Sequence, residues 1–225
     1  MLESRMQEIS EMRRYASPVT TPQALAWKDG ELWLSSRDLG TLQQIEPETG
    51  NVLQELDPPG VVWAAVATDR GWRFTVGKGL NDDRYVYSYS RERGFEKLFA
   101  CPDFAGSYLS FDGDSLYFSQ WYKGEIHEVD DEGKIRRTIQ VGAEISGHVF
   151  VDGTLYVVRG HENTNVPGKA EEWRLARIDP AAAGKPDVED VAVIPYASRS
   201  VAYDGERFWS NHRAANEIVS FALPT

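Results

Sequence analysis

Histidine and arginine side chains recur in this sequence in polar segments that read as loops or strand ends. His148 lies in GHVFVDG, His161 in RGHENTN and His212 in SNHRAAN. Histidine titrates near neutral pH and can act as a general base, while arginine can hold a carboxylate or stabilise a developing oxyanion. We therefore predict His148 and His212 as catalytic residues, with Arg159 or Arg199 as the group that holds an anion.

Aromatic and amide side chains supply the rest of a candidate ligand site. Trp63 and Trp121 stand in predicted loops, where a ring can stack on a ligand. His161 is either a lid residue or an exposed histidine, Arg37 either contacts a ligand or pairs with a nearby aspartate, and His127 is expected to be exposed. The predicted substrate-binding residues are Gln23, Arg37, Trp63, Tyr108, Gln120, Trp121, Arg159, His161, Arg199 and Asn211.

A period of roughly 40 residues positions these side chains. Five segments share an apolar run, a turn and an alternating run: ALAWKDGELWLSS, AAVATDRGWRFTV, SYLSFDGDSLYFSQ, GHVFVDGTLYVVR and RSVAYDGERFWSN. Such a pattern is typical of a β-hairpin. The aromatic residues of the alternating runs are expected to pack between blades. The turn aspartates are spaced by 40, 43, 40 and 52 residues, at Asp29, Asp69, Asp112, Asp152 and Asp204.

Two further strands follow each hairpin, except in the last unit, which has only one. EMRRYASPV near the N-terminus has the form of the missing strand. We predict an all-β fold: a single five-bladed β-propeller with four-stranded antiparallel blades, closed by residues 12–18 as the outer strand of the last blade. A β-sandwich, the alternative, needs no fivefold repeat. A short helix is expected over residues 2–10, and the expected blades span residues 22–57, 62–101, 105–142, 146–195 and 199–223.

Composition limits the function classes. The 225 residues include 24 Lys and Arg against 35 Asp and Glu, and this net charge of −11 argues against nucleic acid as a ligand. No apolar run reaches the length of a membrane span, and the first ten residues lack the apolar stretch of a signal peptide. We therefore expect a cytoplasmic protein with no membrane partner. Cys101 is the single cysteine, so no internal disulfide forms.

The propeller prediction divides the loops between two faces. Turns inside the hairpins and between third and fourth strands form the bottom face, where acidic residues such as 130–132 are expected to be solvated. Loops before each first strand and between second and third strands form the top face, which holds the candidate site. We predict no cofactor. A divalent cation in the central channel is the alternative, with amide oxygens from Gln23, Gln120 and Asn211, although carboxylates are missing from the inner-strand starts.

The first repeat resembles a known family. Residues 21–56, TPQALAWKDGELWLSSRDLGTLQQIEPETGNVLQEL, are similar to the opening blade of plant-type and bacterial glutamine cyclotransferases. This resemblance implies a five-bladed propeller, and streptogramin-lyase-like and NHL-like repeats share part of the pattern. In the cyclotransferases a glutamate that serves as acid/base follows a glycine where the second blade begins. This chain has PPGVVWAAVATD there, without glutamate, which argues against cyclisation of N-terminal glutamine.

The same top-face residues fit three functions. The first is a hydrolase, lyase or cyclotransferase-like enzyme with a histidine base, and the second is a non-catalytic propeller that binds or senses a ligand. The third is a protein-interaction scaffold that uses the outer rim. We predict a small-molecule-binding propeller whose site is the top mouth of the channel and whose ligand is anionic or aromatic. Arg199→Ala and His148→Ala are expected to spare the fold while weakening ligand binding.

Overall fold

Tight turns reverse the chain between the first and second strands of each blade. Asp29 and Gly30 adopt positive φ values of 50° and 84°, and Asp152 and Gly153 adopt 49° and 78°. Two successive residues at positive φ form the turn whose twist matches that of the flanking strands. Asp tolerates this conformation better than most residues, and Gly carries no Cβ that opposes it.

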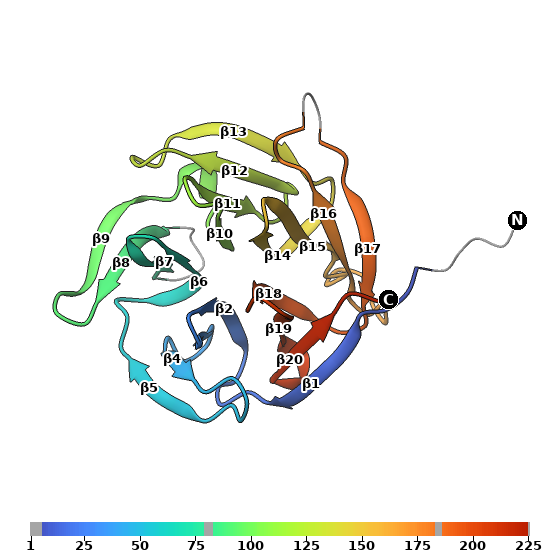
Figure 1. Ribbon diagram of the computed structural model, residues 1–225, viewed down its shortest axis with the longest axis horizontal. Helices are drawn as coiled ribbons and strands as arrows, with labels where there is room; N and C mark the ends of the chain where they lie inside the picture. Colours follow the sequence, from blue (N-terminus) through green and yellow to red (C-terminus); the bar gives the residue numbers. More distant parts are fainter. Residues whose placement is uncertain (1–5, 79–82, 183–185, 225) are drawn as a thin grey trace, which may run out of the picture.

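The computed structural model describes residues 6–78, 83–182 and 186–224. These residues form five four-stranded antiparallel sheets arranged as a ring, with the first strand of each blade innermost (Figure 1). Blade 1 contains β2 (Pro22–Lys28), β3 (Glu31–Ser36), β4 (Leu42–Ile45) and β5 (Val52–Leu56). Blade 2 contains β6 (Val61–Thr68), β7 (Gly71–Gly77), β8 (Tyr85–Ser90) and β9 (Gly94–Ala100). Blade 3 contains β10 (Leu109–Phe111), β11 (Leu116–Gln120), β12 (Glu125–Val129) and β13 (Ile135–Gln140).

The remaining elements complete the ring. Blade 4 contains β14 (Glu144–Val151), β15 (Thr154–His161), β16 (Glu172–Ile178) and β17 (Glu189–Ile194). Blade 5 contains β18 (Ser198–Tyr203), β19 (Phe208–His212), β20 (Glu217–Ala222) and, from the other end of the chain, β1 (Ser10–Ala16). Two short 3-10 helices are η1 (Pro102–Phe104) and η2 (Arg213–Ala215). Among the described residues, no helix is long and apolar enough to cross a membrane.

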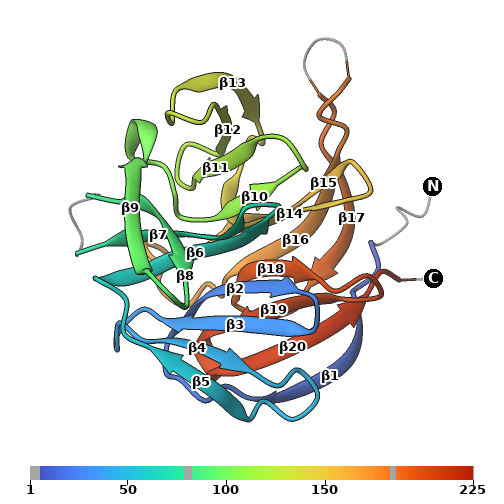
Figure 2. The same cartoon turned by 60° about the vertical axis from the view of Figure 1, so that its left-hand side comes forward.

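The N-terminal strand closes the ring, as predicted. β1 runs antiparallel to β20, with Ser10 opposite Ala222 and Ala16 opposite Glu217, and Figures 1 and 2 both show it along the outer edge of blade 5. The strand lies two residues earlier than the predicted 12–18. Its last contact with this blade's backbone is the Ser17 N–H, which donates to Asn216 at 2.8 Å. Pro18 has no N–H and cannot extend the ladder.

The helix expected over residues 2–10 does not form in its described part, residues 6–10. Glu8 instead makes an isolated parallel bridge to Val193 of β17. The Ile9 N–H donates to the Val193 carbonyl at 3.0 Å, and the Val193 N–H donates to Gln7 at 2.9 Å. Ile9 is buried with Trp173. The outer edge of β17 offers this segment backbone partners and an apolar contact, which a short isolated helix lacks.

Buried apolar side chains lie between neighbouring blades. One cluster joins Trp33 of blade 1 to Phe74 of blade 2, and another joins Trp209 of blade 5 to Leu34 of blade 1. The prediction that aromatic residues of the second strands fill the spaces between blades is confirmed. Because the inner strands are buried in this way, side chains that meet a ligand at the central channel have to lie near the ends of those strands.

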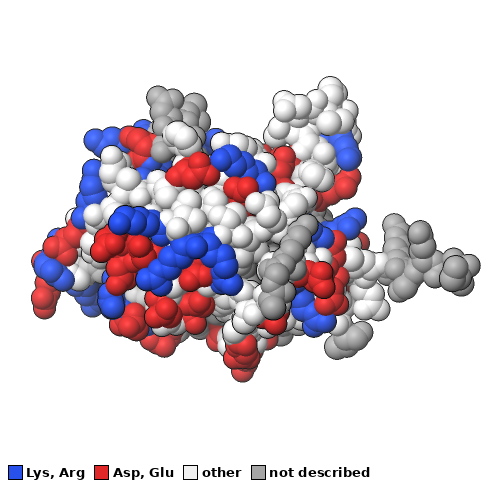
Figure 3. All heavy atoms as spheres, turned by 90° about the horizontal axis from the view of Figure 1, so that it is seen from above, with Lys and Arg blue, Asp and Glu red and all other residues white. Residues whose placement is uncertain are grey.

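Acidic side chains gather on one side of the ring. Figure 3 views the propeller from its edge, and Asp and Glu are concentrated along the lower border of the molecule. The hairpin turn aspartates are bound into local structure as well. Asp204, for example, accepts hydrogen bonds from the backbone of Glu206 at 2.9 Å and of Arg207 at 2.8 Å. These carboxylates shape turns in addition to contributing negative charge.

Candidate functional site at the top of the ring

Loops of the top face enclose a cavity of about 320 Å³, which we call the mouth. Every residue around it lies near the start of an innermost strand or in a connection between second and third strands. The mouth is lined by Gln23, Arg37, Trp63, Arg84, Ser107, Tyr108, Trp121, Tyr122, Ile145, Glu162 and Arg213.

Trp63 gives one side of the mouth a cationic and aromatic character. The guanidinium carbon of Arg84 lies 4.2 Å from the centre of the Trp63 ring, and that of Arg37 lies 5.5 Å from it. Arg84 also donates a hydrogen bond to Ser107 Oγ at 2.9 Å. The Trp63 Nε1 atom is buried and has no hydrogen-bond acceptor among the described residues. This side of the mouth therefore offers a flat ring beside two guanidinium groups, together with an indole N–H donor.

Arg213 is a cation of the mouth that pairs with no carboxylate of residues 6–78, 83–182 or 186–224. It donates to Gln23 Oε1, while its own Nε is buried without an acceptor in the same residue ranges. Burial lowers the pKa of Arg213 to about 10. Tyr108 opposes this shift, the positive charges of Arg199 and Arg37 add to it, and the carboxylate of Glu162 also opposes it. A guanidinium in these surroundings is stabilised when an anion binds beside it.

Arg199 contrasts with Arg213, because its charge is already neutralised. Only 2% of Arg199 is exposed, and its amino groups lie 2.7 Å from Glu171 Oε2 and 2.9 Å from Glu162 Oε1. Burial disfavours its charge, but Tyr108, Glu171 and Glu162 raise its pKa above the ordinary value. Arg199 does not line the mouth. The expectation that its removal spares the fold is therefore replaced, since removal leaves two carboxylates without their partner.

His148 lies in the central channel and not in the mouth. It borders a cavity of about 160 Å³ between the innermost strands, together with Ser110. Its Nδ1 lies 2.6 Å from Ser110 Oγ, and its Nε2 is buried without a partner in the described parts of the chain. Burial lowers the pKa of His148 to about 3. A general base works best with a pKa near the working pH, so this environment does not favour the predicted base.

The other two candidate histidines also lie away from the mouth lining. His212 Nδ1 is 3.3 Å from Glu217 Oε2 and 3.1 Å from an amino group of Arg14, and its ring packs 5.1 Å from that of Tyr196. These contacts tie β19 to the closing strand. His161 is exposed at the end of β15. The two predicted catalytic histidines therefore do not meet in one site.

Three predicted ligand-binding residues are engaged in contacts between and within blades. Arg159 Nε lies 2.7 Å from Asp190 Oδ1 of β17. The Gln120 amide donates to the backbone carbonyl of Asp103 at 2.6 Å, and the Asn211 amide donates to a backbone carbonyl of blade 1 at 3.1 Å. The amide oxygens considered for a channel cation are not gathered around the mouth.

The structure brings five predicted binding residues together and adds others. The predicted residues in the mouth are Gln23, Arg37, Trp63, Tyr108 and Trp121. The sequence could have indicated the other lining residues, because each is next to a predicted site residue or lies in a loop of the top face. The lining residues that were not predicted are Arg84, Ser107, Tyr122, Ile145, Glu162 and Arg213.

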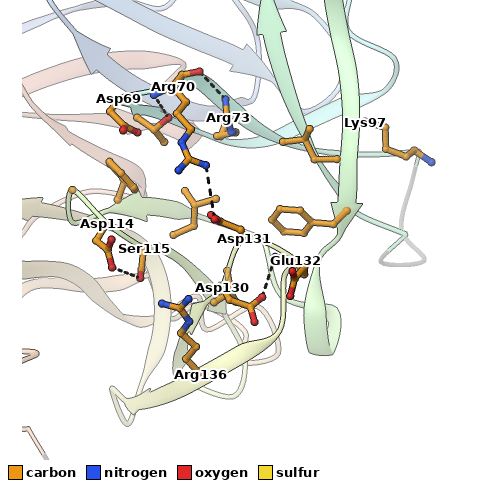
Figure 4. A pocket seen from close by; sticks show the side chains of 17 residues that line it. Asp69, Arg70, Arg73, Lys97, Asp114, Ser115, Asp130, Asp131, Glu132 and Arg136 are labelled. Carbon is orange, nitrogen blue, oxygen red and sulfur yellow. Dashed lines mark hydrogen bonds and ion pairs between the residues drawn. The ribbon is translucent and has the colours of Figure 1, made fainter.

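A larger hollow of about 710 Å³ lies on the bottom face between blades 2 and 3 (Figure 4). Basic and acidic side chains both line it, and most of them are exposed, while Arg73 and Asp130 are partly buried. Arg70 and Asp131, for example, approach to 3.8 Å with 70% and 85% of their side chains exposed. Exposed opposite charges screen one another and are well solvated. Arg73 of this hollow is partly buried and burial lowers its pKa, so the mouth is distinguished by the guanidinium groups of Arg84 and Arg37 beside the Trp63 ring and not by a desolvated charge alone.

His127 is buried, with 2% of the residue exposed, and this corrects the expectation that it is exposed. Linker η1, which joins blades 2 and 3, brings Asp103 close to it. Asp103, Glu125 and His127 each offer one metal-ligand atom, and these atoms lie within 4.8 Å of one another. The polar pattern of β12 could not reveal this burial, since Asp103 comes from the linker η1 and Thr138 from the neighbouring strand β13.

No protein-family model and no curated protein matches this sequence. Solved structures match its fold, among them glutaminyl cyclase from Myxococcus xanthus, with a TM-score of 0.68, 16% identity and coverage of 96% of this chain and 98% of that chain. Virginiamycin B lyase from Staphylococcus aureus matches with a TM-score of 0.53, 12% identity and coverage of 94% and 99%. PQQ-bound aldose sugar dehydrogenase from Streptomyces coelicolor matches with a TM-score of 0.55, 14% identity and coverage of 95% and 97%. The predicted likeness to the glutamine cyclotransferase fold is confirmed, and at these identities the likeness concerns the fold alone.

Proposed function

We propose that the mouth binds a small organic anion that carries a flat ring. The observation that carries this proposal is the state of Arg213, a guanidinium bonded to the Gln23 amide and to no carboxylate of the described residues. Burial of an unpaired charge is costly, and a bound carboxylate or similar anion removes that cost. Arginine suits a carboxylate because its planar fork can donate two parallel hydrogen bonds.

The aromatic residues of the mouth define the other half of the ligand. Trp63 of β6 lies beside the guanidinium groups of Arg84 and Arg37, and Trp121 contacts the Tyr122 ring at 5.7 Å between centres. Rings of this kind stack on flat apolar groups. A cavity of about 320 Å³ is at the small end of the range for ligand sites. The ligand is therefore a compact aromatic or heteroaromatic acid.

A matched pair of probes tests the proposal. Phenylacetate and phenylacetamide share a ring and differ in charge, and quenching of the tryptophan fluorescence reports binding. We expect phenylacetate to bind at least about tenfold more tightly than the amide, the preference that a charge-assisted hydrogen bond supplies. Arg213→Met should abolish this preference. Arg136→Met removes an exposed arginine of the larger hollow on the bottom face, called the bottom groove below. This variant should keep the preference for phenylacetate. Equal binding of the two probes, or no binding of either, contradicts the proposal.

A second candidate function is acid–base catalysis at the same mouth, and the position of Glu162 favours it. Glu162 is the carboxylate of the mouth lining, and its Oε1 is held by Arg199 at 2.9 Å. A positioned carboxylate can donate or accept a proton for a bound substrate. Two of the matched structures are a cyclase and a lyase by name. Because the chain lacks the glutamate expected of the cyclotransferases, virginiamycin B, the substrate in the name of the matched lyase, is the candidate to test first.

Glu162→Gln separates catalysis from binding. Once a substrate that the protein converts has been found, kcat of this variant should be about 100-fold or more below that of the unmodified protein, which is the usual contribution of a general acid or base, while KM changes little. Glu172→Gln, which alters an exposed glutamate of β16, is the control and should keep full turnover. Unchanged kcat in Glu162→Gln rules out this role for Glu162. The anion-binding proposal is tested separately, by the comparison of phenylacetate with phenylacetamide.

A further inference from the structure

A second group of polar side chains lies outside the mouth lining, at the junction of blades 2 and 3. It comprises Asp103 of η1 with Glu125 and His127 of β12. The His127 Nε2 atom lies 3.6 Å from Asp103 Oδ2 and 3.9 Å from Glu125 Oε2. Glu125 and His127 are two residues apart on one strand, so both side chains project from the same face of the sheet. Asp103 approaches that face from the linker.

The burial and hydrogen bonding of His127 are those of a metal ligand and not of a surface residue. Only 3% of its side chain is exposed, and its Nε2 is a buried atom without a hydrogen-bond partner in the described residues. Its other ring nitrogen, Nδ1, lies 2.9 Å from Thr138 Oγ1 of β13. A hydrogen bond at one nitrogen that fixes the ring and directs the other nitrogen towards an ion is the usual arrangement around a metal-bound histidine.

We propose that Asp103, Glu125 and His127 form a binding site for a divalent transition-metal ion of the zinc type. One imidazole nitrogen and two carboxylate oxygens are a ligand set that zinc accepts, and three protein ligands leave a fourth position open to solvent or substrate. Metal–ligand bonds of about 2.0–2.1 Å in tetrahedral geometry separate the ligand atoms by about 3.4 Å. The separations of 3.6 and 3.9 Å from the histidine are close to this value, and the two carboxylates, whose ligand atoms lie within 4.8 Å of each other, have to move together when an ion binds.

The linker is built to hold Asp103 in this position. Asp103 adopts a left-handed backbone conformation, with φ of 47°, which is uncommon for a residue other than glycine. Its backbone carbonyl accepts a hydrogen bond from the buried Gln120 amide at 2.6 Å. Gln120 and Glu125 are opposite each other in the β11–β12 ladder. The same strand pair therefore anchors the linker and supplies two of the three ligands.

Lys123 competes with a metal ion for the carboxylate of Asp103. Its ammonium lies 2.8 Å from Asp103 Oδ2, and 41% of its side chain is exposed. A cation thus already occupies the outer side of the site, and the long side chain is free to swing into solvent when a divalent ion enters. This geometry predicts that removal of the Lys123 charge strengthens metal binding, which a merely structural ion pair would not show.

The test uses the full chain without a polyhistidine tag. Co²⁺ is titrated while its visible absorption bands are recorded, and Zn²⁺ then displaces it in the same cuvette, since zinc binds such sites more tightly than cobalt. We expect one ion per chain. Asp103→Asn and His127→Gln should each weaken Zn²⁺ binding by at least about tenfold, because each removes one of three protein ligands. Lys123→Met should strengthen it several-fold at low ionic strength.

Controls and a second readout keep the outcome clear. His161→Gln and Asp131→Asn change an exposed histidine and an exposed aspartate, and both should bind Zn²⁺ like the unmodified protein. Zn²⁺ should also raise the melting temperature of the unmodified protein and not that of Asp103→Asn, whose altered residue is exposed. Binding weaker than millimolar, or less than a tenfold loss in either ligand variant that remains folded, overturns the proposal.

Discussion

The side chain of Gln23 accepts a hydrogen bond from Arg213, which lies 190 residues further along the chain. Gln23 belongs to the first blade and Arg213 follows β19 of the last, so this contact crosses the seam where the ring closes. The amide of Gln23 also donates to the backbone of Trp63 at 3.1 Å. One side chain therefore links three blades at the mouth, and the shape of the mouth depends on closure of the ring.

Deletion of residues 1–17 should destabilise the protein and broaden its unfolding transition. The deletion removes β1 and exposes the edge of β20, and blades of a repeat protein rely on contacts with their neighbours. We expect the melting temperature, followed by circular dichroism, to fall by at least about 8 °C. Deletion of residues 1–5, which leaves β1 whole, is the control. Identical melting of the two proteins would show that β1 contributes little to closure.

Arg199 and Arg213 should respond to substitution in different ways. Arg199→Met leaves Glu162 and Glu171 without their buried partner, so we expect the free energy of unfolding to fall by about 3–5 kcal/mol. Arg213→Met removes an uncompensated charge and should change the free energy of unfolding by less than about 1 kcal/mol. Urea denaturation of the two variants measures both values. A large loss in Arg213→Met would assign it a structural role and weaken the proposed anion site.

His148 should make the protein less stable as the pH falls below neutrality. The buried ring has a pKa of about 3, whereas the ring in the unfolded chain titrates near its ordinary value of about 6.5. Between these values the unfolded state binds a proton that the folded state does not. The contribution of this residue to the free energy of unfolding therefore falls by up to about 1.4 kcal/mol per pH unit as the pH decreases from 6.5.

His148→Gln isolates this effect. The difference in the free energy of unfolding between the unmodified protein and His148→Gln should shrink as the pH is lowered from 7 to 4.5. His127, whose pKa burial also lowers, contributes to both proteins and cancels in the difference. A pH-independent difference for His148→Gln would mean that its ring is protonated in the folded protein.

Charge reversal on the bottom face should leave the mouth unaffected. Asp131→Lys with Glu132→Lys changes two exposed residues of the bottom groove. Asp130 is left in place because its carboxylate accepts hydrogen bonds from the backbone of Glu132 and Lys134. The dissociation constant of phenylacetate should change by less than about twofold, since exposed charges are screened over about 8 Å at physiological ionic strength. A larger change would place the ligand at the bottom groove.

The sequence by itself determined the architecture of this protein. Repeated hairpins with Asp-Gly turns indicated five blades, and the unpaired last unit together with EMRRYASPV indicated closure by the N-terminal segment. These features depend on the residues of each turn and on alternation along each strand, and both are local patterns that can be read from the sequence. The same register placed Trp63 and Trp121 at the mouth, although Trp63, expected in a loop, lies near the start of β6. By contrast, residues 6–10 were expected to be helical, and only the free edge of β17 makes them extended.

Only the tertiary structure decided the state of each polar side chain. Arg199 and Arg213 are alike in sequence, yet the first is enclosed by two carboxylates and the second meets an amide from the opposite end of the chain. His127 and His148 are both histidines of β-strands. Linker η1 brings Asp103 to the first, which has Glu125 on its own strand, while the second lies in the central channel. Charge and pKa depend on partners and burial contributed by other blades. Residue type and spacing along one strand do not predict which residues of other blades will be those partners.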